Sequence, residues 1–168
     1  EDKIVAIPMK CQFRWSMVNF GLVRSLGIST TAGYDRTWGK LALSANANYT
    51  CQRDRDFSSP SDPEYKNTIP YSPLHSASLI VSLGYDGWSA CTSWLYTGDR
   101  FALISNNKED MLGAWQTVDL KLSKTFTVSR HSLQTTIECN NLTDSRHEVV
   151  KRYPMPGRNW KLTLQWRM

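Results

Sequence analysis

The sequence is poor in the features that mark several large protein classes. It has no uninterrupted apolar run approaching the roughly 18 residues that a membrane-spanning helix needs. Its four cysteines, Cys11, Cys51, Cys91 and Cys139, show no C-x-x-C spacing and do not suggest a zinc site. No spaced catalytic motif is present. These absences argue against a helical membrane protein, a zinc-binding domain and an enzyme, and the sequence predicts no metal and no cofactor.

The chain also lacks the marks of a complete secreted protein and of a nucleic-acid-binding protein. It begins at Glu1 without an initiator methionine or a signal peptide, so we expect a piece of a longer protein. Its 20 Lys and Arg residues against 15 Asp and Glu give a net charge of +5. These cations do not form a stripe with interleaved aromatic residues, which nucleic-acid binding favours. We therefore expect no nucleic-acid partner.

The segment from Gly157 to Met168 shows the clearest pattern in the chain. From Trp160 on, every even position is large and apolar and every odd position is polar. This period of two predicts a strand with one apolar and one polar face. A strand that crosses a bilayer needs roughly 9–11 residues, and this segment is long enough. Its edge must pair with another strand.

The same period recurs along the chain. Counting the last segment, it predicts eight strands and no helix of consequence, at about residues 1–8, 26–34, 41–52, 76–85, 88–96, 117–126, 133–139 and 160–168. Ile80 is an apolar exception on an otherwise polar face. The mean hydropathy is negative. A negative value is compatible with a transmembrane barrel, because the inward half of such a barrel is polar. The predicted fold class is therefore all-β.

The predicted connections alternate in length. Residues 35–39, 86–87 and 127–130 are short connections, and residues 9–21, 53–74, 99–113 and 142–156 are long ones. Outer-membrane barrels have short periplasmic turns and longer extracellular loops, so the alternation places the C terminus in the periplasm.

Aromatic residues gather near both predicted ends of the strands, as they do at the two surfaces of a membrane. The short-turn group is Tyr34, Trp38, Tyr85, Trp88, Phe126 and Trp166, and the long-loop group is Tyr49, Tyr96, Trp115 and Trp160. A soluble sandwich or a lipocalin-like barrel also shows strands at period two, but it seldom carries aromatic residues at both strand ends.

Two motifs precede the last strand. Asn140-Asn141-Leu142-Thr143-Asp144 is followed by Tyr153-Pro154-Met155-Pro156-Gly157-Arg158. Together with the alternating strand, they resemble the C-terminal signature of TonB-dependent outer-membrane receptors. Thr143 stands where that family usually has Phe, and Met168 where it usually has an aromatic residue.

The resemblance implies a fold and a set of partners. It implies that residues 1–168 are the C-terminal part of an antiparallel barrel of about 22 strands, whose plug domain and earlier strands lie outside this chain. It implies active transport of a scarce ligand, a ferric siderophore or a cobalamin-like corrinoid, with energy delivered by TonB through the N-terminal part of the receptor. A surface lipoprotein is a further partner of this kind of receptor. The competing hypothesis is an autonomous eight-stranded outer-membrane barrel with a structural or adhesive role.

Cations concentrate in the predicted long loops. They are Arg53, Arg55, Lys66, Arg100, Lys108, Arg146, Lys151 and Arg152. One interpretation is general attraction to the phosphates of lipopolysaccharide, and the other is capture of an anionic ligand such as a ferric siderophore. The sequence does not separate these, nor does it separate them from a corrinoid.

The longest predicted loop, residues 53–74, is the candidate binding site, because binding residues gather on long loops of a rigid scaffold. Its candidate ligand-binding residues are Arg53, Arg55, Tyr65, Lys66 and Tyr71. The arginines are suited to charge-assisted hydrogen bonds with an anion. The alternative is that Arg53, Asp54, Arg55 and Asp56 form ion pairs at the rim.

The cysteines and histidines carry no predicted chemistry. Cys51 and Cys139 fall on the lipid-facing side of non-neighbouring strands and Cys91 on the opposite side, so we expect free thiols that pack as small apolar groups. The histidines, His75, His131 and His147, lie at or beyond strand ends with no carboxylate at ligand spacing, which is typical of solvated loop residues.

Overall fold

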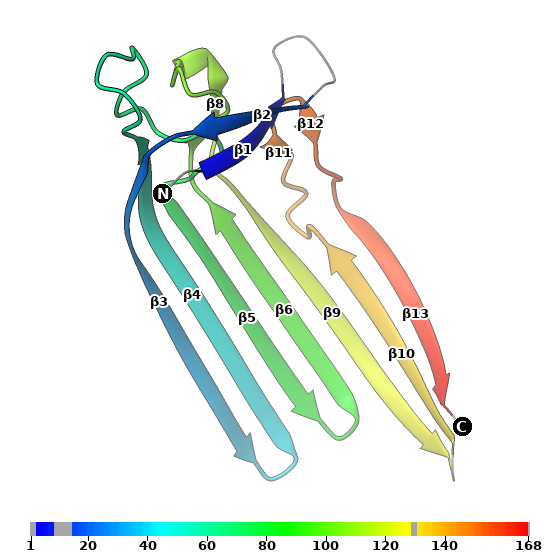
Figure 1. Ribbon diagram of the computed structural model, residues 1–168. Helices are drawn as coiled ribbons and strands as arrows, with labels where there is room; N and C mark the ends of the chain where they lie inside the picture. Colours follow the sequence, from blue (N-terminus) through cyan, green and yellow to red (C-terminus); the bar gives the residue numbers. More distant parts are fainter. Residues whose placement is uncertain (1–2, 9–14, 129–130, 168) are drawn as a thin grey trace.

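The computed structural model describes residues 3–8, 15–128 and 131–167, and its centre is one antiparallel sheet of seven strands (Figure 1). In chain order these strands are β3 (Val23–Trp38), β4 (Leu41–Asp56), β5 (His75–Tyr85), β6 (Trp88–Thr97), β9 (Trp115–Val128), β10 (His131–Asn140) and β13 (Asn159–Arg167). They pair in the order β13-β10-β9-β6-β5-β4-β3, so each lies beside its predecessor in the sheet. The predicted antiparallel up-and-down barrel segment is confirmed.

Shorter elements lie in the connections at one end of the sheet. They are β1 (Lys3–Pro8), β2 (Trp15–Phe20), β7 (Arg100–Phe101), the 3-10 helix η1 (Lys108–Asp110), β8 (Met111–Leu112), β11 (Glu148–Val150) and β12 (Tyr153–Pro154). No helix in the described part of the chain is long and apolar enough to cross a membrane.

The N-terminal region differs from the prediction. Residues 15–20, which were predicted to lie in a loop, form β2 and pair along their whole length with β1. Residues 9–14 lie outside the described residues. β1 and β2 form a separate two-stranded sheet that crosses the long-loop end of the large sheet (Figure 1). The first of the eight predicted strands therefore belongs to this hairpin and not to the seven-stranded sheet.

The register gives the large sheet one apolar face and one polar face. Leu43 lies opposite Leu83, which lies opposite Ala90, which lies opposite Leu122, and the row continues to Ile137 and Leu162. We call the face that bears this row the apolar face and the other the polar face. Because its large side chains are exposed rather than covered by a second layer, the apolar face requires an apolar surrounding.

The predicted aromatic residues lie on the apolar face, with one exception. Tyr85 pairs with Trp88 at the short-turn end, and Trp160 lies opposite Cys139 at the long-loop end. Trp115 pairs with Thr97, which belongs to the polar face. Its placement in the long-loop aromatic group was therefore wrong, because Trp115 alternates with the apolar-face residues of β9.

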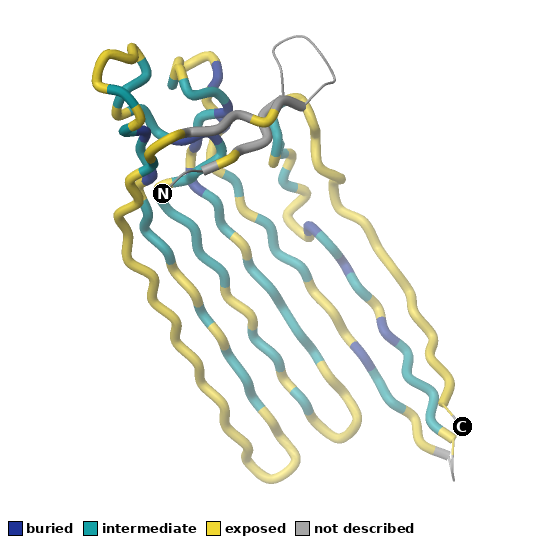
Figure 2. The backbone as a smooth tube through the Cα atoms, in the orientation of Figure 1, coloured by how far each residue is buried: buried dark blue, intermediate teal, exposed yellow. Residues whose placement is uncertain are grey.

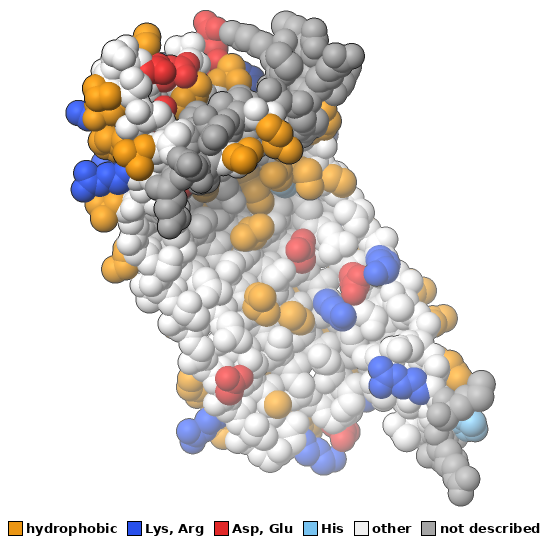
Figure 3. Space-filling model, in the orientation of Figure 1, with side chains coloured by type: hydrophobic (Ala, Val, Ile, Leu, Met, Phe, Trp, Pro, Cys, Tyr) orange, Lys and Arg blue, Asp and Glu red, His pale blue; other side chains and the backbone are white. Residues whose placement is uncertain are grey.

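The polar face is built largely from small polar side chains, and few hydrophobic side chains lie over it (Figure 3). Ser123 and Thr136 share a hydroxyl hydrogen bond of 3.0 Å between neighbouring strands. Glu138 accepts two ion pairs across three strands, from Lys121 at 3.5 Å and from Lys161 at 3.4 Å. Ile80 lies on this face opposite Ser93, as predicted from the pattern.

Two tight turns close the short-turn end. Asp86 and Gly87 connect β5 to β6 and both have positive φ, +46° and +79°. Two positive φ values in a two-residue hairpin define a type I′ turn, for which Asp-Gly is a favoured pair. Gly39 has a φ of +59° between β3 and β4. The predicted connection at 127–130 includes residues 129–130, which lie outside the described residues.

Most of the sheet is exposed, and the buried residues concentrate elsewhere (Figure 2). Ile69, Ala102 and Leu112 are among the few buried apolar residues, and all three lie in the long loops. Along the edge strands β3 and β13, described side chains are exposed at every position but Val23. The only compact core in the described part of the chain is therefore the loop end of the sheet.

The cysteines give a first testable prediction. Cys51, Cys91 and Cys139 are free thiols, and Cys139 is 1% exposed, whereas Cys11 lies outside the described residues. Alkylation of the folded protein by a bulky water-soluble maleimide should spare Cys139, because the reagent cannot reach it. Unfolding without a reductant should then bring the total to four labels by mass spectrometry. A lower total would show a disulfide and contradict the prediction.

Candidate functional site

Three long loops meet at one end of the sheet. They are the first loop (residues 57–74), the second loop (98–114) and the third loop (141–158), which follow β4, β6 and β10. We call them together the loop cap. Their lengths match the predicted alternation. Most of the buried residues of the described chain lie in this cap or at the strand ends below it, so the cap is a packed structure and not a set of independent loops.

The first and second loops are joined through backbone and amide groups. Asn106 Nδ2 donates to the Thr68 carbonyl at 2.9 Å, and the Thr68 N–H donates to Asn106 Oδ1 at 2.7 Å. Asn67 Nδ2 donates to the Ile104 carbonyl at 2.9 Å. The Tyr71 N–H donates to the Phe101 carbonyl at 2.7 Å. These contacts fix the position of Tyr71 beside the second loop.

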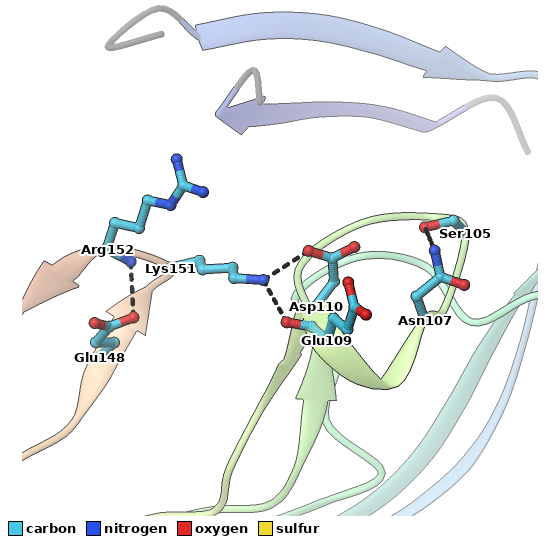
Figure 4. Close-up of polar contacts among 7 residues, drawn as sticks. All are labelled: Ser105, Asn107, Glu109, Asp110, Glu148, Lys151 and Arg152. Carbon is cyan, nitrogen blue, oxygen red and sulfur yellow. Dashed lines mark hydrogen bonds and ion pairs between the residues drawn. The ribbon is translucent and has the colours of Figure 1, made fainter. Parts of the chain in front are cut away.

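The second and third loops are joined by charged side chains. Arg100 Nη2 donates to the carbonyls of Glu148 at 2.7 Å and Val149 at 3.0 Å. Lys151 Nζ donates to Asp110 Oδ1 at 2.6 Å and to the Glu109 carbonyl at 2.7 Å (Figure 4). Asp110 is buried, and a buried carboxylate needs such a partner because desolvation of an unpaired charge is costly.

The two motifs before the last strand contact each other within the third loop. Asn141 Nδ2 donates to the Ser145 carbonyl at 2.9 Å and to the Pro156 carbonyl at 3.3 Å. The Arg158 N–H donates to Asp144 Oδ1 at 2.8 Å. A Cβ atom at Gly157 would lie 2.7 Å from that oxygen, so any larger residue there would displace the Asp144 carboxylate from its contact with Arg158. The motifs therefore form the local structure that ends β10 and starts β13.

Arg53 and Arg55 lie outside the first loop, contrary to prediction. β4 continues to Asp56, and Arg53 and Arg55 pair with Leu26 and Arg24 of β3. Alternation directs both arginines to the apolar-face side, whereas Asp54 and Asp56 point to the other side and are buried. Because neighbouring residues of a strand face in opposite directions, the arginines and carboxylates of this segment do not face one another.

Tyr65 and Lys66 lie together in the first loop. The Tyr65 ring packs edge-on against Phe57 with 5.4 Å between ring centroids, and Lys66 Nζ lies 5.2 Å from the Tyr65 ring centroid. Lys66 is exposed and Tyr65 half-buried. Of the five predicted site residues, these two are neighbours at the loop surface, and Tyr71 lies deeper.

Tyr71 has a strained backbone and a buried hydroxyl. Its φ of +59° is unusual for a bulky residue and costs free energy unless the surroundings hold it. Burial raises the pKa of the Tyr71 hydroxyl, and the nearby Lys151 backbone opposes this shift. Within the described part of the chain the hydroxyl donates no hydrogen bond. The strained backbone therefore holds a hydroxyl group whose hydrogen has no acceptor among the described residues.

Two further residues also have buried donors, and neither was a predicted site residue. Arg100 Nη1 and Trp115 Nε1 are buried without a hydrogen-bond partner among the described residues. Arg100 is 5% exposed, and burial lowers the pKa of its guanidinium. Trp115 stacks on His147 with 4.2 Å between ring centroids. His147 directly precedes Glu148, whose carbonyl accepts a hydrogen bond from Arg100. Tyr71, Arg100 and Trp115 therefore bring unsatisfied hydrogen-bond donors to the junction of the three loops.

Two of the three histidines, His75 and His147, are half-buried, contrary to the prediction of solvated residues, whereas His131 is exposed. His147 is half-buried under Trp115. The His75 ring nitrogen Nδ1 lies 2.9 Å from the Tyr49 hydroxyl, and the His131 ring stacks on Trp166 at 5.6 Å. Each histidine thus packs on an aromatic residue, which no local sequence signal indicated.

Comparison with known proteins agrees with the barrel fold. Residues 1–142 match the protein family described as TonB dependent receptor-like, beta-barrel. No curated protein sequence matches the chain.

Solved structures show the same fold at low sequence identity. The ferric preacinetobactin receptor BauA from Acinetobacter baumannii is 14% identical with a TM-score of 0.70, and the alignment covers 98% of this chain and 25% of the receptor. The copper transporter OprC is 15% identical (TM-score 0.63; 98% and 26% covered). The ferric yersiniabactin uptake receptor FyuA from Yersinia pestis is 13% identical (TM-score 0.52; 99% and 31% covered). The chain thus spans between a quarter and a third of the proteins whose fold it shares.

Proposed function

Because the chain belongs to the TonB-dependent receptor β-barrel family, we propose that it supplies barrel wall and extracellular loops to an outer-membrane receptor for a scarce ligand. The whole receptor takes up its ligand with energy that TonB delivers through an N-terminal part. The apolar face then contacts membrane lipid, and the polar face lines the interior of the barrel. The loop cap lies outside the cell, and the C terminus lies in the periplasm.

The open sheet supports this proposal over an autonomous eight-stranded barrel. β3 and β13 are the two edges of the sheet, and neither pairs with the other or with β1 or β2. An exposed edge strand carries unpaired N–H and C=O groups, which a bilayer does not tolerate. We propose that earlier strands of the same receptor close the barrel and that a plug domain fills it. The small side chains of the polar face leave room for such a domain.

The observation that carries the ligand class is the donor-rich junction of the loop cap. Tyr71, Arg100 and Trp115 present buried donors without acceptors among the described residues. The hydrogen bonds of the buried Arg100 guanidinium go to neutral carbonyls, with the Asp99 carboxylate nearby, so its free Nη1 favours a negatively charged acceptor. We therefore propose that the receptor binds an anionic ligand, and a ferric siderophore is the first candidate. Tyr65 and Lys66 of the first loop are assigned to the initial contact with that ligand.

Binding measurements on the full-length receptor test this assignment. Arg100→Met and Tyr71→Phe should each weaken binding of the transported ferric siderophore, the first by roughly tenfold or more, because a charge-assisted hydrogen bond contributes about 1.5–3 kcal/mol. Arg152→Met is the matched control, because Arg152 is an exposed residue of the third loop. The ligand panel is a set of ferric siderophores, cobalamin and copper.

Two outcomes would contradict the assignment. One is unchanged affinity for every transported ligand in Arg100→Met and Tyr71→Phe, with normal surface expression. The other is selective transport of cobalamin or of copper. Replacing residues 58–65 by two glycines tests the outer part of the loop separately, since Asp56 already bonds to Lys66 and Asn67 across the base of this excursion. Unchanged uptake in that variant would remove the role assigned to Tyr65.

A further inference from the structure

Three arginines lie together on the apolar-face side of β3 and β4, at the long-loop end. Arg24 is directly opposite Arg55 in the register, and Arg53 precedes Arg55 by one repeat of the strand. Arg24 and Arg53 are exposed and Arg55 is half-buried. The Arg24 guanidinium carbon lies 5.8 Å from the centroid of the Phe57 ring. We call these residues the arginine cluster.

The cluster lies at the point where the apolar band of these strands ends. On β4 the apolar-face positions from Leu41 to Cys51 carry no charge, and this stretch matches the roughly 9–11 residues of a membrane-crossing strand. The next two positions on this face are Arg53 and Arg55. On β3, Ile28 and Leu26 are 67% and 74% exposed, and the next position is Arg24. The cluster is therefore at the level of the lipid headgroups on the outer side.

The positive charges of the cluster are not neutralised by ion pairs within the described residues. Like charges directly opposite each other destabilise a strand pair. The ion pairs found in the described part of the chain are all made by lysines. Asp54 and Asp56 alternate with the arginines and point away from them. An anion at this surface would relieve the repulsion between Arg24 and Arg55.

We propose that Arg24, Arg53 and Arg55 bind the phosphate groups of lipopolysaccharide in the outer leaflet. This inference rests on the proposed outer-membrane placement and goes beyond ligand uptake. Guanidinium groups bind phosphate through paired, charge-assisted hydrogen bonds. Their position directly above the lipid-facing band places them beside the phosphates of the lipid A anchor. The arginine cluster thus contacts lipid and lies outside the ligand site at the loop junction.

The test measures binding of lipid A to the full-length receptor in zwitterionic phospholipid nanodiscs. Bisphosphorylated lipid A should bind the unmodified receptor, and the double variant Arg24→Gln/Arg55→Gln should bind it roughly tenfold or more weakly, because two charge-assisted contacts are lost. Arg53→Gln should show a smaller loss. Arg36→Gln is the matched control, because Arg36 lies on the same face of β3 at the short-turn end, opposite Leu43. Its affinity should be unchanged.

Lipid A with its phosphates removed provides the second arm. It should bind weakly, and to the same extent in the unmodified receptor and the double variant. Equal affinity of the two proteins for bisphosphorylated lipid A would overturn the proposal. So would an equal loss with both lipids, which would show that the arginines do not act through the phosphates. Membrane fractionation is run in parallel: a receptor absent from the outer membrane overturns the proposed function, whereas unchanged lipid A affinity in a correctly placed receptor overturns only the arginine cluster.

Discussion

Replacing Leu164 by arginine should destabilise the folded receptor by roughly 2–4 kcal/mol, the cost of an arginine on the lipid-facing side of a barrel near the membrane midplane. Leu164 lies in the middle of β13, opposite Thr135, and is 64% exposed on the apolar face. In water such an exposed leucine would tolerate arginine. The predicted cost therefore depends entirely on lipid at this surface.

Thr163 is the matched control at nearly the same depth. It pairs with Thr136 on the polar face, so Thr163→Arg should cost much less. The measurement is urea-induced unfolding of the full-length receptor in bilayers. Spin labels at the two positions give an independent check, because oxygen should quench the label at Leu164 preferentially and a water-soluble nickel complex the label at Thr163. Equal costs, or equal access at both positions, would refute the lipid-facing assignment of β13.

Replacing Asn106 by alanine should open the contact between the first and second loops. The Asn106 side chain donates to the carbonyls of Thr68, Leu103 and Ile104 and accepts from the Thr68 N–H. The amide nitrogen has two hydrogens for its three acceptors, so about three hydrogen bonds are lost, or roughly 3 kcal/mol at about 1 kcal/mol each. Asn106 also has a φ of +52°, a conformation that asparagine tolerates better than alanine.

Hydrogen exchange detected by mass spectrometry measures this opening. The amide of Thr68 should exchange at least roughly 100-fold faster in the variant, since 1.4 kcal/mol corresponds to a factor of ten. Asn107→Ala is the control, because Asn107 makes one long side-chain contact of 3.4 Å with Ser105 (Figure 4). Similar exchange in both variants would show that Asn106 does not hold the loops together.

The strands of the large sheet were predictable because a membrane imposes a strict alternation on them. The ends of these strands were harder to predict. β4 continues through Arg53, Asp54, Arg55 and Asp56, which a hydrophobicity pattern treats as a polar loop. The segment nevertheless keeps a period of two in the sign of its charge, with cations on one side and buried carboxylates on the other. Where β4 extends beyond its apolar band, its two sides therefore differ in the sign of their charge and no longer in polarity.

The loop cap was predictable in place but not in structure. Loop lengths and the Asn-Leu-Thr-Asp and Pro-Gly-Arg motifs located it, because those motifs act over short sequence separations. The contacts that organise it join residues far apart in the chain, such as Asn106 with Thr68 and Arg100 with Glu148. No local pattern marks either residue. β2 was missed for a different reason: it forms a local hairpin with β1, but the connection between them carries no turn signal.

The order of the strands in the sheet bears on how the protein reaches its folded state. Each strand of the large sheet after β3 pairs with the strand before it in that sheet, so each pairing closes one local connection and has a low entropic cost. Folding can therefore advance along the chain one hairpin at a time. The turns at Gly39 and at Asp86–Gly87 lie at the ends of the first two hairpins. In the proposed placement these tips stay on the periplasmic side with the C terminus, and the long loops of the loop cap are the parts that must cross the bilayer.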